Sequence, residues 1–123
     1  MKRVFLNKLN ENWVVDRFRS EWYEYQSELS ENNVRDSDVI WIIAPWTWNK
    51  IPKRHLKNKK VICTIHHIDE EKFLKKEKEN FYNRDKFVDE YHVISNKTKK
   101  QVQQYTDKKI HSIPFWVNQN VWF

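Results

Sequence analysis

Glycine is absent from all 123 residues of this sequence. Loops that wrap around phosphate need glycine, because it adopts positive φ angles without cost and lets a ligand approach the backbone closely. Its absence excludes the glycine-rich dinucleotide fingerprint and the P-loop. The nucleophile elbow of serine hydrolases also requires glycine and is excluded as well. The commonest nucleotide-binding α/β enzymes are therefore not candidates.

Cysteine and long apolar segments are also scarce. The single cysteine, Cys63, lies in an apolar run, which excludes a disulfide framework and predicts a buried, inert thiol in a reducing compartment. The apolar start, residues 4–6, is too short for a signal peptide. The longest apolar run, residues 39–48, has about half the length of a membrane span. We therefore expect a cytoplasmic protein that can still contact the inner face of a membrane.

Positive charge is concentrated in the second part of the chain. The net charge is +6, from 23 basic and 17 acidic residues. Residues 1–50 carry 7 basic and 8 acidic side chains, whereas residues 51–123 carry 16 and 9. Such a surface attracts phosphate, nucleic acid or anionic lipid, or it only keeps the protein soluble. The densest stretch, here called the basic segment, contains Lys50, Lys53, Arg54, Lys57, Lys59 and Lys60 without one acid.

Apolar runs and helical periodicity predict an α/β fold in one domain. A first helix, starting at Asn10 or Asn12, carries apolar residues at alternating intervals of three and four. Two further helices are expected to start at Asp69 and Ser95, each as an amino-terminal cap. Continuous apolar strands indicate an open, mostly parallel sheet of about five strands with helices on both faces. The expected strands are residues 2–8, 38–44, 61–65, 91–94 and 110–113.

Polar and aromatic residues follow the predicted strands, at the edge where parallel sheets bind ligands. His66, His67 and Asp69 come directly after residues 61–65 and suggest a metal site. Adjacent strand residues point to opposite faces, however, and no further ligand set completes such a site. We expect no metal, and His66 is either a polar or proton-handling contact or a structural histidine. His67 is expected either to pack or to support the site residues from behind.

Other strand ends carry further candidates. Trp46 and Trp48 can stack on a sugar, lie against lipid or pack beneath a loop. Ser95, Asn96, Lys97 and Thr98 place a hydroxyl, an amide and an ammonium group at a helix amino terminus, which favours either an anion site or a plain cap. The apolar tail at residues 115–123 predicts a partner surface.

Five segments in this order resemble the amino-terminal half of GT-B glycosyltransferases, most closely the fourth sequence family, which is mostly retaining. They are Glu11 to Arg17, Ser37 to Trp41, Val61 to Asp69, Tyr91 to Thr98 and Ile113 to Asn118. The resemblance covers nearly the whole chain. It implies a Rossmann-like acceptor-side domain over residues 1–113, with residues 114–123 starting the crossover to a second domain.

In that family, two Rossmann-like domains face each other across a cleft, and the first holds the acceptor while the second holds the nucleotide-sugar. The resemblance implies that His66 is a catalytic histidine near the transferred sugar. It also implies that the site needs no metal and that basic and aromatic surface docks on membranes, here the basic segment with Trp46 and Trp48. The implied substrate-binding residues are Asn12, Asp16, Arg17, Ser95, Asn96, Lys97 and Thr98.

Two departures from the family affect these expectations. Many relatives have a glycine-rich loop after the first strand, and residues 7–12 contain no glycine. The chain also stops at Phe123, before the domain that carries the paired glutamates and the basic residues for the diphosphate. We therefore expect an acceptor-binding half that is inactive without a donor domain, supplied in cis or as a separate chain, and that binds no cofactor itself.

Two other classes of function remain open. The chain can be a non-catalytic module that binds nucleic acid or another polyanion through basic and aromatic surface, although nucleic acid is the less favoured partner. Strong salt dependence of oligonucleotide binding would indicate such a module. The chain can also be a structural or regulatory subunit that pairs through residues 115–123.

Overall fold

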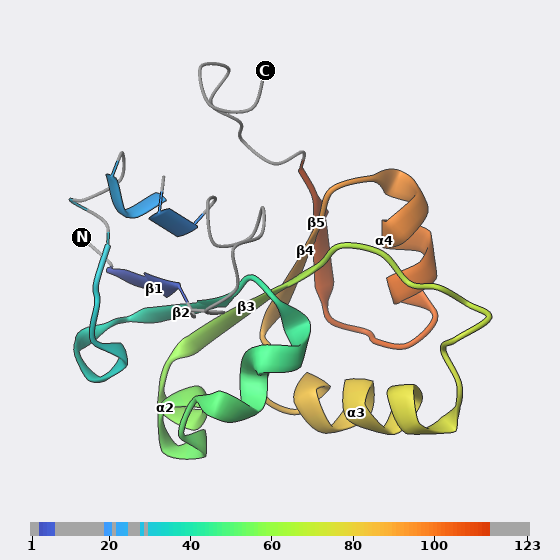
Figure 1. The fold of residues 1–123 in the computed structure, drawn as a ribbon, viewed down its shortest axis with the longest axis horizontal. Helices are drawn as coiled ribbons and strands as arrows, with labels where there is room; N and C mark the ends of the chain where they lie inside the picture. The colour runs from blue at the N-terminus through green and yellow to red at the C-terminus, as the bar shows by residue number, and fades with distance from the viewer. Residues whose placement is uncertain (1–2, 7–18, 21, 25–27, 29, 114–123) are drawn as a thin grey trace.

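The computed structural model describes residues 3–6, 19–20, 22–24, 28 and 30–113. Within these residues, five strands form one sheet in which every neighbouring pair is parallel. They follow chain order across the sheet, with β3 in the middle (Figure 1). The predicted open parallel α/β sheet is confirmed. The strands are Val4–Leu6 (β1), Val39–Ile42 (β2), Lys60–Ile65 (β3), Glu90–Val93 (β4) and Lys109–Ser112 (β5).

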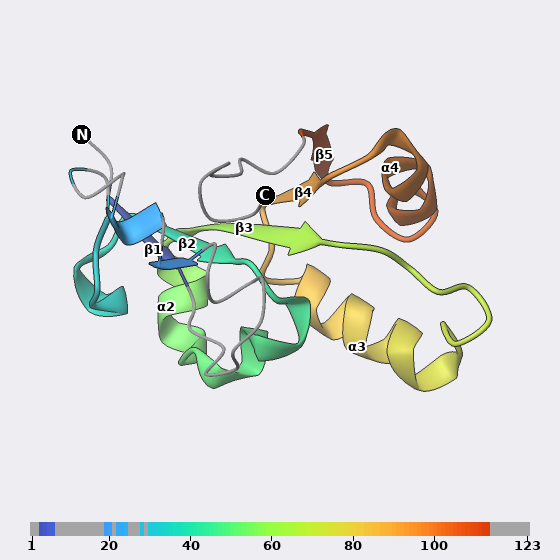
Figure 2. The same ribbon diagram turned by 45° about the horizontal axis from the view of Figure 1, so that its top comes forward.

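Helices cover both faces of the sheet, as the sequence predicts. Figure 2 shows α2 and α3 on one side of the strands and the helical residues 19, 20 and 22–24 on the other. The α4 helix lies on the same face as α3, because Val102 of α4 and Phe81 of α3 belong to one buried cluster. The described helices are η1 (Val34–Asp36), η2 (Pro45–Lys50), α2 (Lys53–Asn58), α3 (Lys75–Asp85) and α4 (Asn96–Gln103).

Alternation along β2 explains why this strand is apolar on both faces. Ile40 and Ile42 are fully buried in the larger core cluster, which also contains Leu56 of α2. Trp41 lies between them and points to the opposite face, since side chains alternate along a strand. There its ring meets Trp22 edge-on, with a centroid distance of 5.3 Å. A strand covered on both sides needs a continuous apolar run, which residues 39–44 provide.

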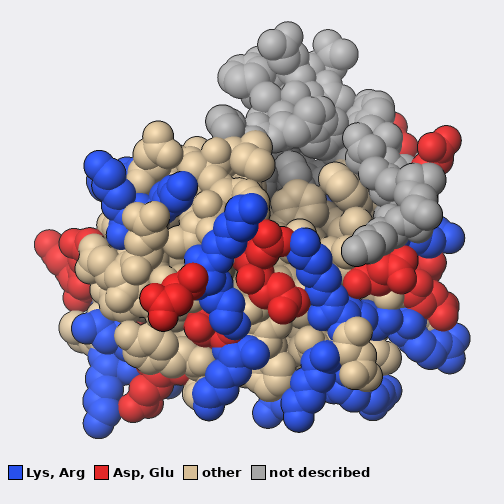
Figure 3. Space-filling model, turned by 180° about the vertical axis from the view of Figure 1, so that it is seen from behind, with Lys and Arg blue, Asp and Glu red and all other residues tan. Residues whose placement is uncertain are grey.

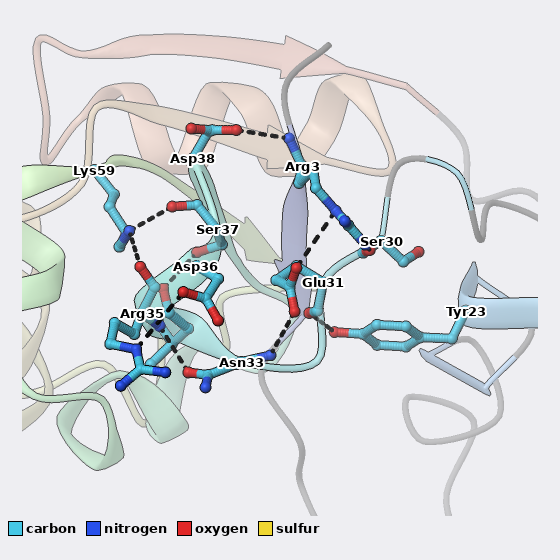
Figure 4. Close-up of polar contacts among 11 residues, drawn as sticks. Arg3, Tyr23, Ser30, Glu31, Asn33, Arg35, Asp36, Ser37, Asp38 and Lys59 are labelled. Carbon is cyan, nitrogen blue, oxygen red and sulfur yellow. Dashed lines mark hydrogen bonds and ion pairs between the residues drawn. The ribbon is translucent and has the colours of Figure 1, made fainter.

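Polar contacts hold the short edge strand β1 in place (Figure 4). The Arg3 guanidinium donates to the carbonyl oxygen of Ser30 at 2.6 Å. The Tyr23 hydroxyl accepts from the backbone N–H of Leu6 at 3.1 Å and donates to the carbonyl oxygen of Glu31 at 2.8 Å. A strand of three residues has few ladder hydrogen bonds. These side-chain bonds therefore fix its position, and we interpret the cluster as structural.

The helix predicted to start at Asp69 starts later, at Lys75. The Asp69 carboxylate accepts from the backbone N–H of Glu71 at 3.2 Å, and its carbonyl oxygen accepts from the N–H of Lys72 at 3.0 Å. These bonds close a local turn. An aspartate can use its side chain in this way instead of capping a helix. The prediction that Asp69 caps a helix is wrong. Residues 69–74, which precede α3, form a loop beside the carboxyl end of β3.

Candidate functional site

A pocket of about 460 Å³ opens at the carboxyl end of β3, on the sheet face that α2 and α3 cover. Its walls come from η2, from the loop at residues 66–73 and from α3. The order of the described strands never reverses, so this sheet lacks the reversal at which doubly wound folds open a crevice. The pocket forms between η2 and α3 instead, at the sheet edge that the sequence predicts.

Two tryptophans of η2 line this pocket in different ways. Pro45 begins η2 three residues after the last residue of β2, and the tight 3-10 turn brings both Trp46 and Trp48 to the pocket. Trp46 is 51% exposed. Trp48 is partly buried and stacks on Phe87, with a centroid distance of 5.7 Å. Trp46 is thus the more exposed of the two tryptophans that line the pocket.

His66 lines the same pocket and is half-buried. Its Nε2 lies 2.8 Å from the carbonyl oxygen of Ile43. A carbonyl oxygen only accepts, so Nε2 carries the proton and donates it in this bond. Burial lowers the pKa of His66 below 6.5, the bond to Ile43 opposes that shift, and nearby His67 adds to it. The ring is therefore neutral and held in one orientation near pH 7.

The loop after His66 supplies exposed polar groups. His67 and Asp69 are exposed and line the pocket. The exposure of His67 contradicts the packing alternative, while a supporting role beside His66 stays a prediction. Within the described ranges, no group of three or more His, Cys, Asp or Glu side chains is placed to hold a metal ion.

Arg84 is the pocket residue that the sequence analysis missed. It lines the pocket from α3 although it is only 7% exposed. Its guanidinium carbon lies 4.9 Å from the centre of the Phe81 ring, a cation–π contact within one turn of the helix. Arg84 follows Phe81 by three residues and precedes Val88 by four, so it interrupts an apolar stripe. A charged residue at a helix position where the pattern predicts an apolar one was the signal that could have identified Arg84.

Ser95 to Thr98 do not line this pocket. The Ser95 hydroxyl accepts from the backbone N–H of Thr98 at 3.2 Å and lies 3.1 Å from the Thr98 hydroxyl. The predicted cap at the start of α4 is confirmed. Asn96 and Lys97 are exposed beside it. Of the predicted site residues that the structure describes, it brings His66, Trp46 and Trp48 together and leaves the residues at the start of α4 apart.

The basic segment lies on and around α2, and part of its charge is already engaged. Lys59 donates to the carbonyl oxygens of Arg35 and Ser37, and Lys60 pairs with Glu90 at 2.6 Å. Figure 3 shows lysine and arginine interleaved with aspartate and glutamate on the face seen from behind. In the part of the chain that the structure describes, no helix has the length and apolarity needed to cross a membrane.

The remaining predicted residues, Asn12, Asp16 and Arg17, and the tail at residues 115–123, lie outside the described residues. Comparisons with protein-family models, with curated proteins and with solved structures found no match to this chain.

Proposed function

We propose that this chain is the acceptor-binding half of a glycosyltransferase that moves a sugar from a nucleotide-sugar to a glycan or lipid-linked acceptor. The observation that carries the proposal is the pocket at the end of β3, which both Trp46 and His66 line. An indole ring covers the apolar face of a sugar, and an imidazole bonds to its hydroxyl groups. A volume of about 460 Å³ lies in the usual range of roughly 300–1,000 Å³ for small-ligand sites.

The state of His66 supports a role next to a reacting hydroxyl group. A neutral imidazole can take a proton from an attacking hydroxyl, whereas a protonated one cannot. Burial favours the neutral form of His66, and the bond to Ile43 holds the ring in place. Held in this way, His66 needs no reorientation when an acceptor binds.

The proposal requires a second, donor-binding half. Transfer from a nucleotide-sugar depends on positioning the donor and on stabilising the departing diphosphate. The glycine-free sequence contains no phosphate-binding loop of the P-loop or dinucleotide type. We therefore assign acceptor binding to this chain and donor binding to the second half, supplied in cis or as a separate chain.

Sugar transfer from a panel of nucleotide-sugars, measured with the donor-binding half supplied, tests this proposal. We expect His66→Ala to lower the transfer rate about 10²- to 10⁴-fold, the usual contribution of a general acid or base. His55→Ala is the matched control, since His55 lies on α2 outside the pocket.

A second measurement tests acceptor binding without the donor half. Quenching of tryptophan fluorescence by saccharides should saturate in the wild-type chain and weaken about tenfold in Trp46→Ala, a loss of about 1.4 kcal/mol for one stacking contact. An absence of both transfer and saccharide binding would contradict the proposed function. Transfer that is unaffected by His66→Ala would contradict only the role of this residue.

A further inference from the structure

Arg84 is a buried arginine that forms no ion pair with any described residue. The residue is 7% exposed, and its Nε is buried without a hydrogen-bond partner. No hydrogen bond or ion pair joins its guanidinium to another residue in the described ranges. Burying an unpaired charge destabilises a fold, so charged side chains inside proteins normally have a partner.

The nearest carboxylate in sequence, Asp85, makes no ion pair with Arg84 within the described ranges, and its hydrogen bonds go to two hydroxyl groups. Its Oδ1 accepts from the Tyr91 hydroxyl at 2.5 Å and from the Thr106 hydroxyl at 2.8 Å. Two other carboxylates, Asp69 and Glu77, line the pocket, but both are exposed to solvent. Solvent screens exposed charges far more than buried ones. Among the described residues, no carboxylate therefore makes a direct ion pair with the Arg84 guanidinium where it borders the pocket.

We propose that Arg84 makes this pocket a binding site for an oxyanion, the phosphate or carboxylate group of a small organic ligand. The planar guanidinium donates several hydrogen bonds in a fork that matches two oxygens of such a group. Lys72 also lines the pocket from the loop and adds a second positive charge at its exposed side. The aromatic rings of Phe73 and Trp48 favour a ligand whose body is a ring rather than a bare ion.

This assignment does not depend on sugar transfer. It follows from the burial of Arg84 and from its place in the pocket, and it holds for any function in which the pocket takes an anionic ligand. The cation–π contact with Phe81 holds the guanidinium over the aromatic ring at the pocket wall.

The experiment measures the thermal midpoint and ligand affinity of the chain at pH 7.5 and constant ionic strength, with chloride as the reference anion. The probes are inorganic phosphate, glucose 1-phosphate, glucuronate and glucose. If the ligand carries a phosphate, we expect inorganic phosphate and glucose 1-phosphate to raise the midpoint of thermal unfolding. If the ligand carries a carboxylate, we expect glucuronate to raise it, and a site that takes both groups should respond to all three. Glucose, which has no charge, should raise the midpoint less than the oxyanions that bind. Glucuronate separates a carboxylate ligand from a phosphate ligand.

Arg84→Met removes the charge and keeps an unbranched side chain that can pack on Phe81. We expect this variant to lose at least tenfold in affinity for the oxyanion that binds best. Without ligand it should be at least as stable as the wild type, because an unpaired buried charge is gone. Arg84→Lys keeps the charge without the fork and should bind with intermediate affinity. The matched control is Arg54→Met, at an exposed arginine of α2 outside the pocket, which should leave affinity unchanged.

Three results would overturn the assignment. The first is that no oxyanion raises the midpoint of the wild type above its value in chloride. The second is that Arg84→Met, or Arg84→Lys if the first variant does not fold, binds the oxyanion as tightly as the wild type. The third is an equal loss of affinity in Arg54→Met, which would indicate nonspecific attraction to positive charge.

Discussion

The hydroxyl group of Thr64 on β3 lies 3.0 Å from Nδ1 of His92 on the neighbouring strand β4. The same hydroxyl oxygen accepts from Nε1 of Trp41 at 2.8 Å, so its own proton is directed to Nδ1. Nε2 of His92 then carries the ring proton and donates to the carbonyl oxygen of Ile113 at 2.6 Å. This chain of bonds across three strands needs a neutral His92, because a protonated Nδ1 would compete with the hydroxyl proton.

The stability of the protein is predicted to fall in acid because of His92 and His66. Burial lowers both pKa values below 6.5, and for His92 the nearby His66 and His111 rings add to the shift while the bond to Ile113 opposes it. The unfolded chain then binds protons that the folded chain does not, so stability rises with pH in this range. The stability that the two neutral histidines contribute is fully present above pH 6.5. It is lost as the pH falls through their lower pKa values in the folded state.

Urea denaturation between pH 8 and pH 5 measures this loss. His92→Gln should reduce the pH dependence, whereas His67→Gln, at an exposed histidine, should retain most of it, because burial is the larger cause of the lowered pKa of His66. An identical pH dependence in His92→Gln and the wild type would show that this ring is not responsible.

Ser95→Ala is predicted to destabilise the chain by about 1 kcal/mol, because the N–H of Thr98 loses its acceptor at the start of α4. Ser95→Asp keeps a capping oxygen and serves as the control. Free energies of unfolding from urea titrations measure the effect. Loss of saccharide binding in Ser95→Asp at unchanged stability would indicate the substrate contact that the resemblance implies. Equal stability of Ser95→Ala and the wild type would contradict the capping role.

Cys63 is predicted to resist thiol reagents in the folded protein. The side chain is completely buried, and burial raises the pKa of its thiol to about 11, so the reactive thiolate is scarce at pH 8. A coloured disulfide reagent at pH 8 should label the native chain only at the rate of unfolding, and should label it at once in denaturant. Rapid, complete labelling of the native chain would show that the strand β3 opens or that the thiol is accessible.

The basic segment is predicted to bind single-stranded oligonucleotides only weakly at physiological salt. Lys59 and Lys60 are engaged with protein oxygens, which leaves a smaller set of exposed cations, Lys50, Lys53, Arg54 and Lys57. Fluorescence anisotropy at increasing salt measures the affinity and its salt dependence. Tight binding that the combined substitutions Lys53→Gln, Arg54→Gln and Lys57→Gln abolish would instead favour a polyanion-binding module.

Much of the fold could be predicted because the deciding signals are local. The apolar runs around Ile42 and Cys63 indicate strands covered on both faces, and Ser95 indicates the cap of α4. The start of α3 could not be predicted in this way. Asp69 can cap a helix or close a turn with almost the same local sequence, and the structure uses the turn.

The carboxyl end of β3 was predictable as the place of a site from the sequence by itself, because a buried strand that runs into His66 puts polar groups at a sheet edge. Only the tertiary structure decided which residues meet there. It joins η2 and α3 around the pocket, separates Ser95 from it and adds Arg84. The physical reason for this difference is that the patterns that predict a strand involve residues close together in the chain. The surroundings of Arg84, in contrast, depend on segments more than 30 residues apart, from Trp46 to Phe81.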